Sequence, residues 1–158
     1  MSDTITTRRS CGGCTTCCKT LGVDALDKKE GEECRYCDTG KGCKIYASRP
    51  QICINYACDW LNGAGTEDER PDKTGIVVTR VGNRTTGGLY QIVESEPGLL
   101  ASPYGKRLVN KGLALPMVVC YCEKGEPPHL IIPSGAIVHR RVLRFMMNGM
   151  PYRNEDRV

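Results

Sequence analysis

Aromatic residues are scarce in this sequence. They make up 6% of the 158 residues, with one Trp and one Phe, so an apolar core must be built mainly from Val, Ile, Leu and Met. A chain of this length can bury roughly two-thirds of the surface that it exposes when unfolded, which is enough for one core. The N-terminal third is poorer still in large apolar residues. We expect it to need disulfides or metal ions to offset the conformational entropy that is lost on folding.

Long apolar runs are missing too. No stretch approaches the roughly 18 consecutive apolar residues that a membrane-spanning helix requires. Residues 1–10 are polar and contain no apolar run typical of a secretory signal. We therefore expect a soluble, cytoplasmic protein with no membrane partner. In that reducing compartment, clustered cysteines serve as ligands or redox groups rather than as disulfides.

Several motifs that would identify an enzyme are absent. The sequence has no Ser/His/Asp ordering, no phosphate-cradling glycine loop and no dinucleotide fingerprint. Its two histidines, His129 and His139, fit a sheet edge and the exposed side of a helix, where surface histidines are common. His129 stays a candidate base or ligand, but no catalytic residue is assigned. The arginines near the C-terminus are not interleaved with aromatic residues that stack on bases, so no nucleic-acid partner is expected.

Cysteine, by contrast, is abundant. There are 11 cysteines, and nine of them fall within residues 11–58. Four lie in the stretch Cys11-Gly-Gly-Cys14-Thr-Thr-Cys17-Cys18, a density that indicates metal or cluster binding. The net charge of +4 is then weak evidence for a polyanionic partner, because eight thiolates holding two divalent ions would bring it to zero.

A second group of cysteines follows a charged segment. Residues 19–33 are polar, and we expect them to form a solvated excursion at the surface. Cys34, Cys37 and Cys43 come next and surround two glycines, which favours a tight loop that bears metal ligands.

Pro50 predicts the start of a helix over residues 51–61, because proline is favoured at the first helical position. The buried stripe of this helix would comprise Ile52, Tyr56 and Trp60. On a regular helix, Cys53 and Cys58 would lie about 140° apart around the axis, too far to clasp one ion. Either Cys58 serves a second metal, or the helix is distorted, or only one of the two is a ligand.

The second half of the chain has a different pattern. Glycine, proline and charged residues predict a linker over residues 63–74. Strands are predicted at residues 75–81, 89–94, 115–122 and 129–132, the first two forming a hairpin, and helices at 99–113, starting near Ser102, and at 134–147. We expect an α+β fold in which an irregular cysteine-rich metal-binding module, residues 1–62, packs on residues 75–158, a small, mainly antiparallel sheet with two helices, as one compact unit.

Cys120 and Cys122 stand apart from the other cysteines. They alternate with Tyr121 in a predicted strand, so both thiols should point to the same side. They could form a redox pair, cap the metal region, or fill the core as small apolar side chains.

Three motifs resemble one known family. They are C-x-x-C-x-x-C-C at Cys11–Cys18, C-K-I-Y at Cys43–Tyr46 and R-P-x-x-C at Arg49–Cys53, and together they resemble the bacterial YkgJ-like family of cysteine cluster proteins, a zinc- or iron-chelating domain. The resemblance covers about residues 11–60 and leaves Cys37 as an extra thiol. The eight metal ligands that it implies are Cys11, Cys14, Cys17, Cys18, Cys34, Cys43, Cys53 and Cys58.

The identity of the metal stays open between two chemistries. Eight ligands divide into two tetrahedral Cys₄ zinc sites, and adjacent Cys17 and Cys18 point in different directions, which suits two sites or a shared thiolate. C-x-x-C-x-x-C also wraps three corners of a 4Fe-4S cluster, with a remote fourth ligand such as Cys53. No cysteine is followed by proline, and we favour zinc. The Arg49 guanidinium would donate hydrogen bonds to sulfur and reduce repulsion among the thiolates.

The predicted function is therefore metal binding, by zinc or iron chelation in a cysteine cluster. The alternative is an iron–sulfur enzyme or redox protein, since flagellin lysine methylases look like distant relatives and are associated with such a cluster. That alternative would relate the chain to protein-lysine methylation.

Overall fold

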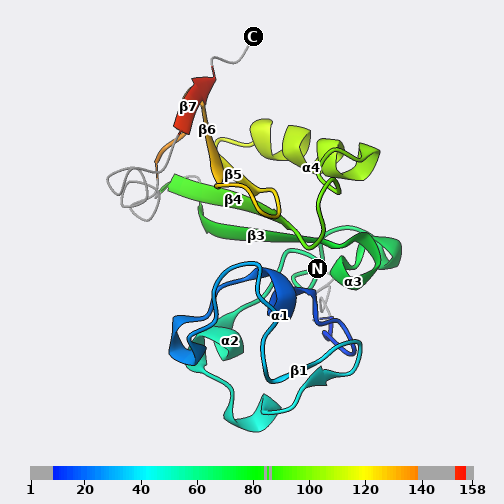
Figure 1. The fold of residues 1–158 in the computed structure, drawn as a ribbon. Helices are drawn as coiled ribbons and strands as arrows, with labels where there is room; N and C mark the ends of the chain where they lie inside the picture. Colours follow the sequence, from blue (N-terminus) through cyan, green and yellow to red (C-terminus); the bar gives the residue numbers. More distant parts are fainter. Residues whose placement is uncertain (1–8, 84, 86, 139–151, 156–158) are drawn as a thin grey trace, which may run out of the picture. The chain divides into compact units, whose positions relative to one another are not determined.

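The computed structural model describes residues 9–83, 85, 87–138 and 152–155. The chain divides into two compact units, Met1–Thr74 (unit 1) and Gly75–Val158 (unit 2), shown in Figure 1. Helices and sheet strands both occur, which confirms the α+β class.

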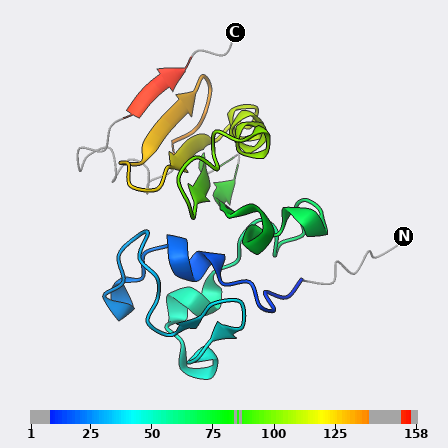
Figure 2. The ribbon, with the colours of Figure 1, turned by 45° about the vertical axis from the view of Figure 1, so that its right-hand side comes forward.

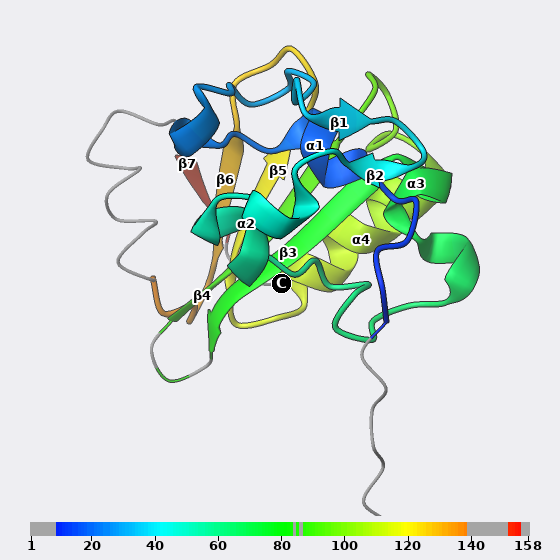
Figure 3. The same cartoon turned by 90° about the horizontal axis from the view of Figure 1, so that it is seen from below.

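Unit 1 is built from short elements joined by loops (Figure 3). Among the described residues of unit 1, the only buried hydrophobic side chains are those of Cys34 and Trp60. This agrees with the predicted shortage of large apolar residues in the N-terminal third. The elements are α1 (Thr16–Thr20), η1 (Asp24–Leu26), β1 (Cys37–Asp38), β2 (Gly42–Cys43), η2 (Tyr46–Ser48), α2 (Gln51–Asn55), η3 (Glu67–Glu69) and α3 (Pro71–Thr74).

The segment predicted as a linker, residues 63–74, is folded into unit 1 around Trp60. The indole Nε1 donates to the carbonyl oxygen of Thr66 at 2.8 Å. The Arg9 guanidinium lies 4.7 Å from the centre of the indole ring and donates to the carbonyl oxygens of Ala64 and Gly65 at 2.9 and 2.8 Å. Glycine and charged residues here form a fixed turn, because a distant arginine satisfies its carbonyl groups.

The helix predicted over residues 51–61 is wrong in its second half. α2 ends at Asn55, and Tyr56 takes an extended backbone with φ −74° and ψ 133°. β-branched residues and Asn are weak helix formers, so nothing local carries this short helix further. The predicted buried stripe of this helix is also wrong, because Ile52 is 58% exposed, although Trp60 is buried.

Unit 2 is a five-stranded sheet in the order β3-β4-β5-β6-β7. The β3–β4 and β5–β6 pairs are antiparallel, and the β4–β5 and β6–β7 pairs are parallel. The hairpin and the four predicted strands are confirmed, and β7 was not predicted. The strands are β3 (Ile76–Asn83), β4 (Gly87–Glu94), β5 (Val118–Cys122), β6 (His129–Pro133) and β7 (Tyr152–Glu155).

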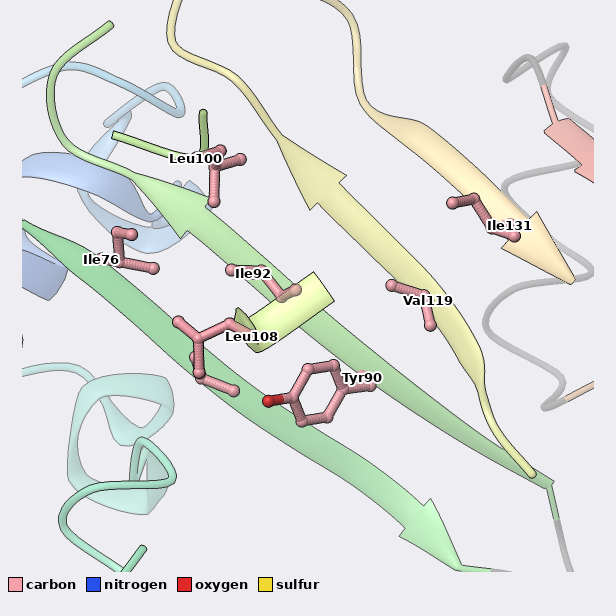
Figure 4. Close-up of a cluster of buried hydrophobic side chains, with 8 residues drawn as sticks. Ile76, Tyr90, Ile92, Leu100, Leu108, Val119 and Ile131 are labelled. Carbon is pink, nitrogen blue, oxygen red and sulfur yellow. The ribbon is translucent and has the colours of Figure 1, made fainter. Parts of the chain in front are cut away.

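Helix α4 (Pro103–Leu113) makes the parallel crossover from β4 to β5 and lies against one face of the sheet (Figures 1 and 2). The predicted start is confirmed, since the Ser102 hydroxyl accepts a hydrogen bond from the Gly105 N–H at 3.1 Å. The core cluster of unit 2, shown in Figure 4, comprises Ile76, Val78, Tyr90, Ile92, Leu100, Leu108, Val119 and Ile131.

The helix predicted over residues 134–147 does not begin at Ser134. Residues 134–138 form a turn and irregular backbone. Gly135 has φ +75°, a left-handed conformation that the first turn of an α-helix cannot contain. Residues 139–147, including His139, lie outside the described part of the chain.

Candidate metal centre

Two glycine-containing loops of unit 1 carry cysteines and touch each other. The first cysteines form a turn closed by the Cys14 N–H and the Cys11 carbonyl at 2.9 Å, while Cys37 and Cys43 stand opposite each other in the β1–β2 hairpin. A Cβ on Gly13 would lie 2.4 Å from the carbonyl oxygen of Gly40. Only glycine at position 13 therefore lets the tip of the hairpin touch the first cysteine loop.

Backbone hydrogen bonds connect the later cysteines to helix α1. The Cys34 N–H donates to the Cys18 carbonyl at 2.9 Å, and the Cys37 N–H donates to the Cys34 carbonyl at 2.8 Å. The end of α2 at Asn55 places Cys58 outside any helix. The two cysteines are therefore not on one continuous helix, and the assignment of each to a metal site stays a prediction.

The thiols influence one another in two groups. Burial raises the pKa of Cys58 above its ordinary value, and the charges of Cys11 and Cys14 raise it further. Burial likewise raises the pKa of Cys11, with Cys14 as the next cause. These three cysteines form group A.

The other group of thiols surrounds Cys53. Burial raises the pKa of Cys53, and the charges of Cys18, Cys34 and Cys43 add to that rise. These four cysteines form group B. The charge of Cys18 also raises the pKa of Cys11, so the two groups are not electrostatically separate.

Cys18 has the most perturbed thiol. A hydrogen bond with Cys17 raises its pKa well above the usual range, and burial and the charge of Cys17 act in the same direction. A hydrogen bond with Cys37 and the positive charge of Lys28 oppose the rise. The structure thus places Cys37, the thiol that the family resemblance leaves spare, beside a predicted ligand. The prediction that Cys34 and not Cys37 is the ligand stays a prediction.

Arg49 contributes positive charge to both groups. Its guanidinium stacks on Tyr46 at 3.7 Å from the ring centre, and its charge lowers the pKa of both Cys11 and Cys53. The Arg49 Nε is buried and has no hydrogen-bond partner among the described residues. This N–H group is therefore available to donate a hydrogen bond to a thiolate ligand.

Lys28 is a second cation that sequence reasoning missed. It is buried, although it belongs to the charged segment that was predicted to be solvated, and its ammonium donates to the carbonyl oxygens of Leu21 and Lys29. Burial lowers its pKa, while the charges of Cys34 and Cys18 oppose that change. A lone lysine in a polar stretch gives no sequence signal of burial, because the enclosing loop forms only in the folded chain.

The donors match a metal site in chemistry but are not gathered around one point. All nine thiols of unit 1 are outside disulfides. Among the described residues, no three Cys, His, Asp or Glu side chains are arranged so that they could hold a metal ion. A bound ion would therefore have to draw the sulfur atoms of each group closer together.

Unit 2 presents its polar side chains beside α4. His129 stacks on Tyr121 with ring centres 4.8 Å apart, and its Nε2 lies 3.6 Å from a carboxylate oxygen of Glu123. The buried Glu94 carboxylate accepts hydrogen bonds from the N–H groups of Leu100 and Lys124 at 2.8 and 3.0 Å. An open cavity of about 320 Å³ is lined by Leu100, Ala101, Lys106, Val109, Asn110, Tyr121 and Glu123. His129 is half-exposed, as predicted for a surface histidine.

The chain matches no protein-family model, and no curated protein or solved structure was found to be similar to it. None of the described helices is both long and apolar enough to span a bilayer.

Proposed function

We propose that residues 11–58 form a cysteine metal centre that binds zinc in two sites. The observation that supports it best is that burial, and after it the charges of neighbouring thiols, raise the pKa of Cys11, Cys53 and Cys58. Near neutral pH such thiols stay protonated unless a cation compensates the thiolate charge, so metal binding and deprotonation are coupled. The motifs at Cys11–Cys18 and Arg49–Cys53, which resemble a zinc- or iron-chelating family, point to the same chemistry.

The two groups of thiols correspond to the two proposed sites. Group A supplies three ligands and group B supplies four, while Cys17, whose thiol lies against Cys18 of group B, is the eighth candidate ligand. Four thiolates around zinc leave no open position, so the ion would act as a structural cross-link. The unused Arg49 Nε–H is available to donate to a thiolate, and the Lys28 ammonium adds positive charge beside Cys18 and Cys34. The proposed role is therefore to hold metal and shape unit 1.

Metal analysis of anaerobically purified protein tests the proposal. We expect colourless protein with two zinc ions per chain. Brown protein that contains iron and inorganic sulfide would show that the centre holds an iron–sulfur cluster instead of zinc. Protein that folds in unit 1 without zinc or iron would refute the metal centre altogether.

Two matched variants sharpen this test. Cys53→Ser removes a proposed ligand, and Cys37→Ser removes the neighbouring thiol that the resemblance leaves spare. We expect Cys53→Ser to lose about one zinc per chain and Cys37→Ser to keep both. Equal loss in both variants would mean that Cys37 is a ligand.

A further inference from the structure

Unit 2 contains a second set of sulfur atoms, outside the cysteine-rich unit. The Sγ atoms of Cys120 and Cys122, both on β5, lie 3.9 Å apart, and each residue is only 5% exposed. We propose that this pair is a separate site for a soft, thiophilic metal ion that bridges the two sulfurs. The proposal does not depend on the metal centre of unit 1.

The alternation of side chains along β5 places the two cysteines on the same face of the sheet. Successive side chains of a β-strand point to opposite faces, so Cys120 and Cys122 share one face while Val119 and Tyr121 share the other. Val119 belongs to the cluster under α4, and Tyr121 packs against it. The two thiols therefore lie on the face of the sheet opposite to α4.

The sheet register gives the pair apolar neighbours. Cys122 lies opposite Val93 of β4, and Cys120 lies between Gln91 of β4 and Leu130 of β6. Val93 and Leu130 are both buried. Buried neighbours restrict water, and none of these three paired residues carries a carboxylate, which disfavours hard cations such as magnesium and calcium.

The separation of the sulfurs fits a bridging ion better than a direct bond. Two metal–thiolate bonds of about 2.3 Å, in the near-linear arrangement that two ligands favour, place the sulfurs about 4.6 Å apart, so each sulfur would move outward by only about 0.35 Å. A disulfide needs the sulfurs about 2.05 Å apart, so each would have to move by about 1 Å within a packed strand. Two residues of strand also place the Cα atoms about 6.6 Å apart, near the upper limit for a disulfide.

The number of donors selects the kind of ion. Among the described residues, no third Cys, His, Asp or Glu joins the pair to make a metal-holding set. Structural zinc takes four ligands. Copper(I) is soft, is selected by thiolates and accepts fewer than four ligands. Binding would exchange the two thiol protons for the ion, without electron transfer.

Copper(I) is the probe for this site. It would be added anaerobically to the reduced, full-length protein, and the two thiols would be labelled with a maleimide in enough urea to make labelling measurable. Trypsin releases the pair in one peptide, Gly112–Lys124, which contains no other cysteine. We expect copper(I) to slow labelling of this peptide at least about tenfold.

Cys120→Ser and Cys122→Ser are the matched controls, with alanine in place of serine if either variant unfolds. In each, the remaining thiol should label at the same rate with and without copper(I). Unchanged labelling of the wild type would overturn the proposal. So would equal slowing in the single variants, which would trace the protection to copper in unit 1. A wild-type peptide that is lighter by two hydrogen atoms before copper is added would show a disulfide instead.

Discussion

Arg49 and Lys28 place positive charge among the thiols of unit 1. Their environments differ, because the Arg49 guanidinium is stacked on Tyr46 with an unused Nε, while the Lys28 ammonium is enclosed by backbone carbonyls. Arginine in this position offers a rigid donor, which lysine cannot reproduce.

Arg49→Lys should therefore weaken metal binding without removing a ligand. We expect an affinity loss of roughly 10- to 100-fold, the usual effect of losing a group that hydrogen-bonds a metal ligand. Competition with a chromophoric zinc chelator measures it. Arg107→Lys is the control, since Arg107 also stacks on a tyrosine, Tyr104, but lies in unit 2. Equal losses of zinc affinity in the two variants would show that the loss does not depend on the place of Arg49 near the thiols.

The raised thiol pKa values predict how zinc binding responds to pH. Cys11, Cys53 and Cys58 have pKa values above the ordinary 9.0. Zinc has to displace the protons of these thiols, so lowering the pH favours the protonated thiols over zinc-bound thiolates.

We expect zinc-loaded protein to release its metal as the pH falls, because protons compete for the thiolates. A chromophoric zinc chelator measures the released metal. The Cys53→Ser variant lacks one proposed ligand and should release zinc at a higher pH than the wild type, and release at the same pH would count against Cys53 as a ligand.

Helix α4 is held close to its surroundings by two glycines. A Cβ on Gly112 would lie 2.5 Å from Cδ1 of Tyr90, and a Cβ on Gly105 would lie 2.5 Å from Cα of Leu100. The Tyr90 ring is fully buried, but as a side chain it can shift more readily than the backbone at Leu100, which is fixed by the hydrogen bond to Glu94. The two positions should therefore differ in tolerance.

We expect Gly105→Ala and Gly112→Ala each to lower the free energy of unfolding by roughly 1–3 kcal/mol, with the larger loss at Gly105. Urea unfolding followed by circular dichroism measures both. Lys106→Ala changes an exposed position of the same helix and should stay within about 0.5 kcal/mol of wild type. A stabilised Gly105→Ala variant would show that the helix does not approach Leu100 as described.

At the scale of the whole chain, the two units have different sources of stability. Unit 2 has an apolar cluster of eight buried residues, while Cys34 and Trp60 are the buried hydrophobic residues of the described part of unit 1. Where a unit has no preformed core, the free energy of metal binding supplies the free energy of folding.

Removing metal with a chelator should therefore unfold unit 1 and leave unit 2 folded. Amide signals of residues 11–58 are expected to lose their dispersion, and those of residues 76–133 to keep it, in a ¹⁵N-labelled sample. Restoring zinc should restore the first set. Dispersed signals for residues 11–58 in metal-free protein would contradict this expectation.

Local patterns in the sequence determined much of unit 2. Alternating apolar residues predicted four strands and a hairpin, and Ser102-Pro103 predicted the start of α4, because these signals depend only on neighbours in the chain. Cysteine spacing in the same way identified the candidate ligands, whose role as ligands remains a proposal.

Only the tertiary structure decided the remaining features. β7, the burial of Lys28, the position of Cys37 beside Cys18 and the folding of residues 63–74 around Trp60 and Arg9 each depend on residues far apart in sequence. Cys120 and Cys122 show both contributions. Strand alternation placed them on one face, but their 3.9 Å separation and their burial come from side-chain packing in the folded sheet.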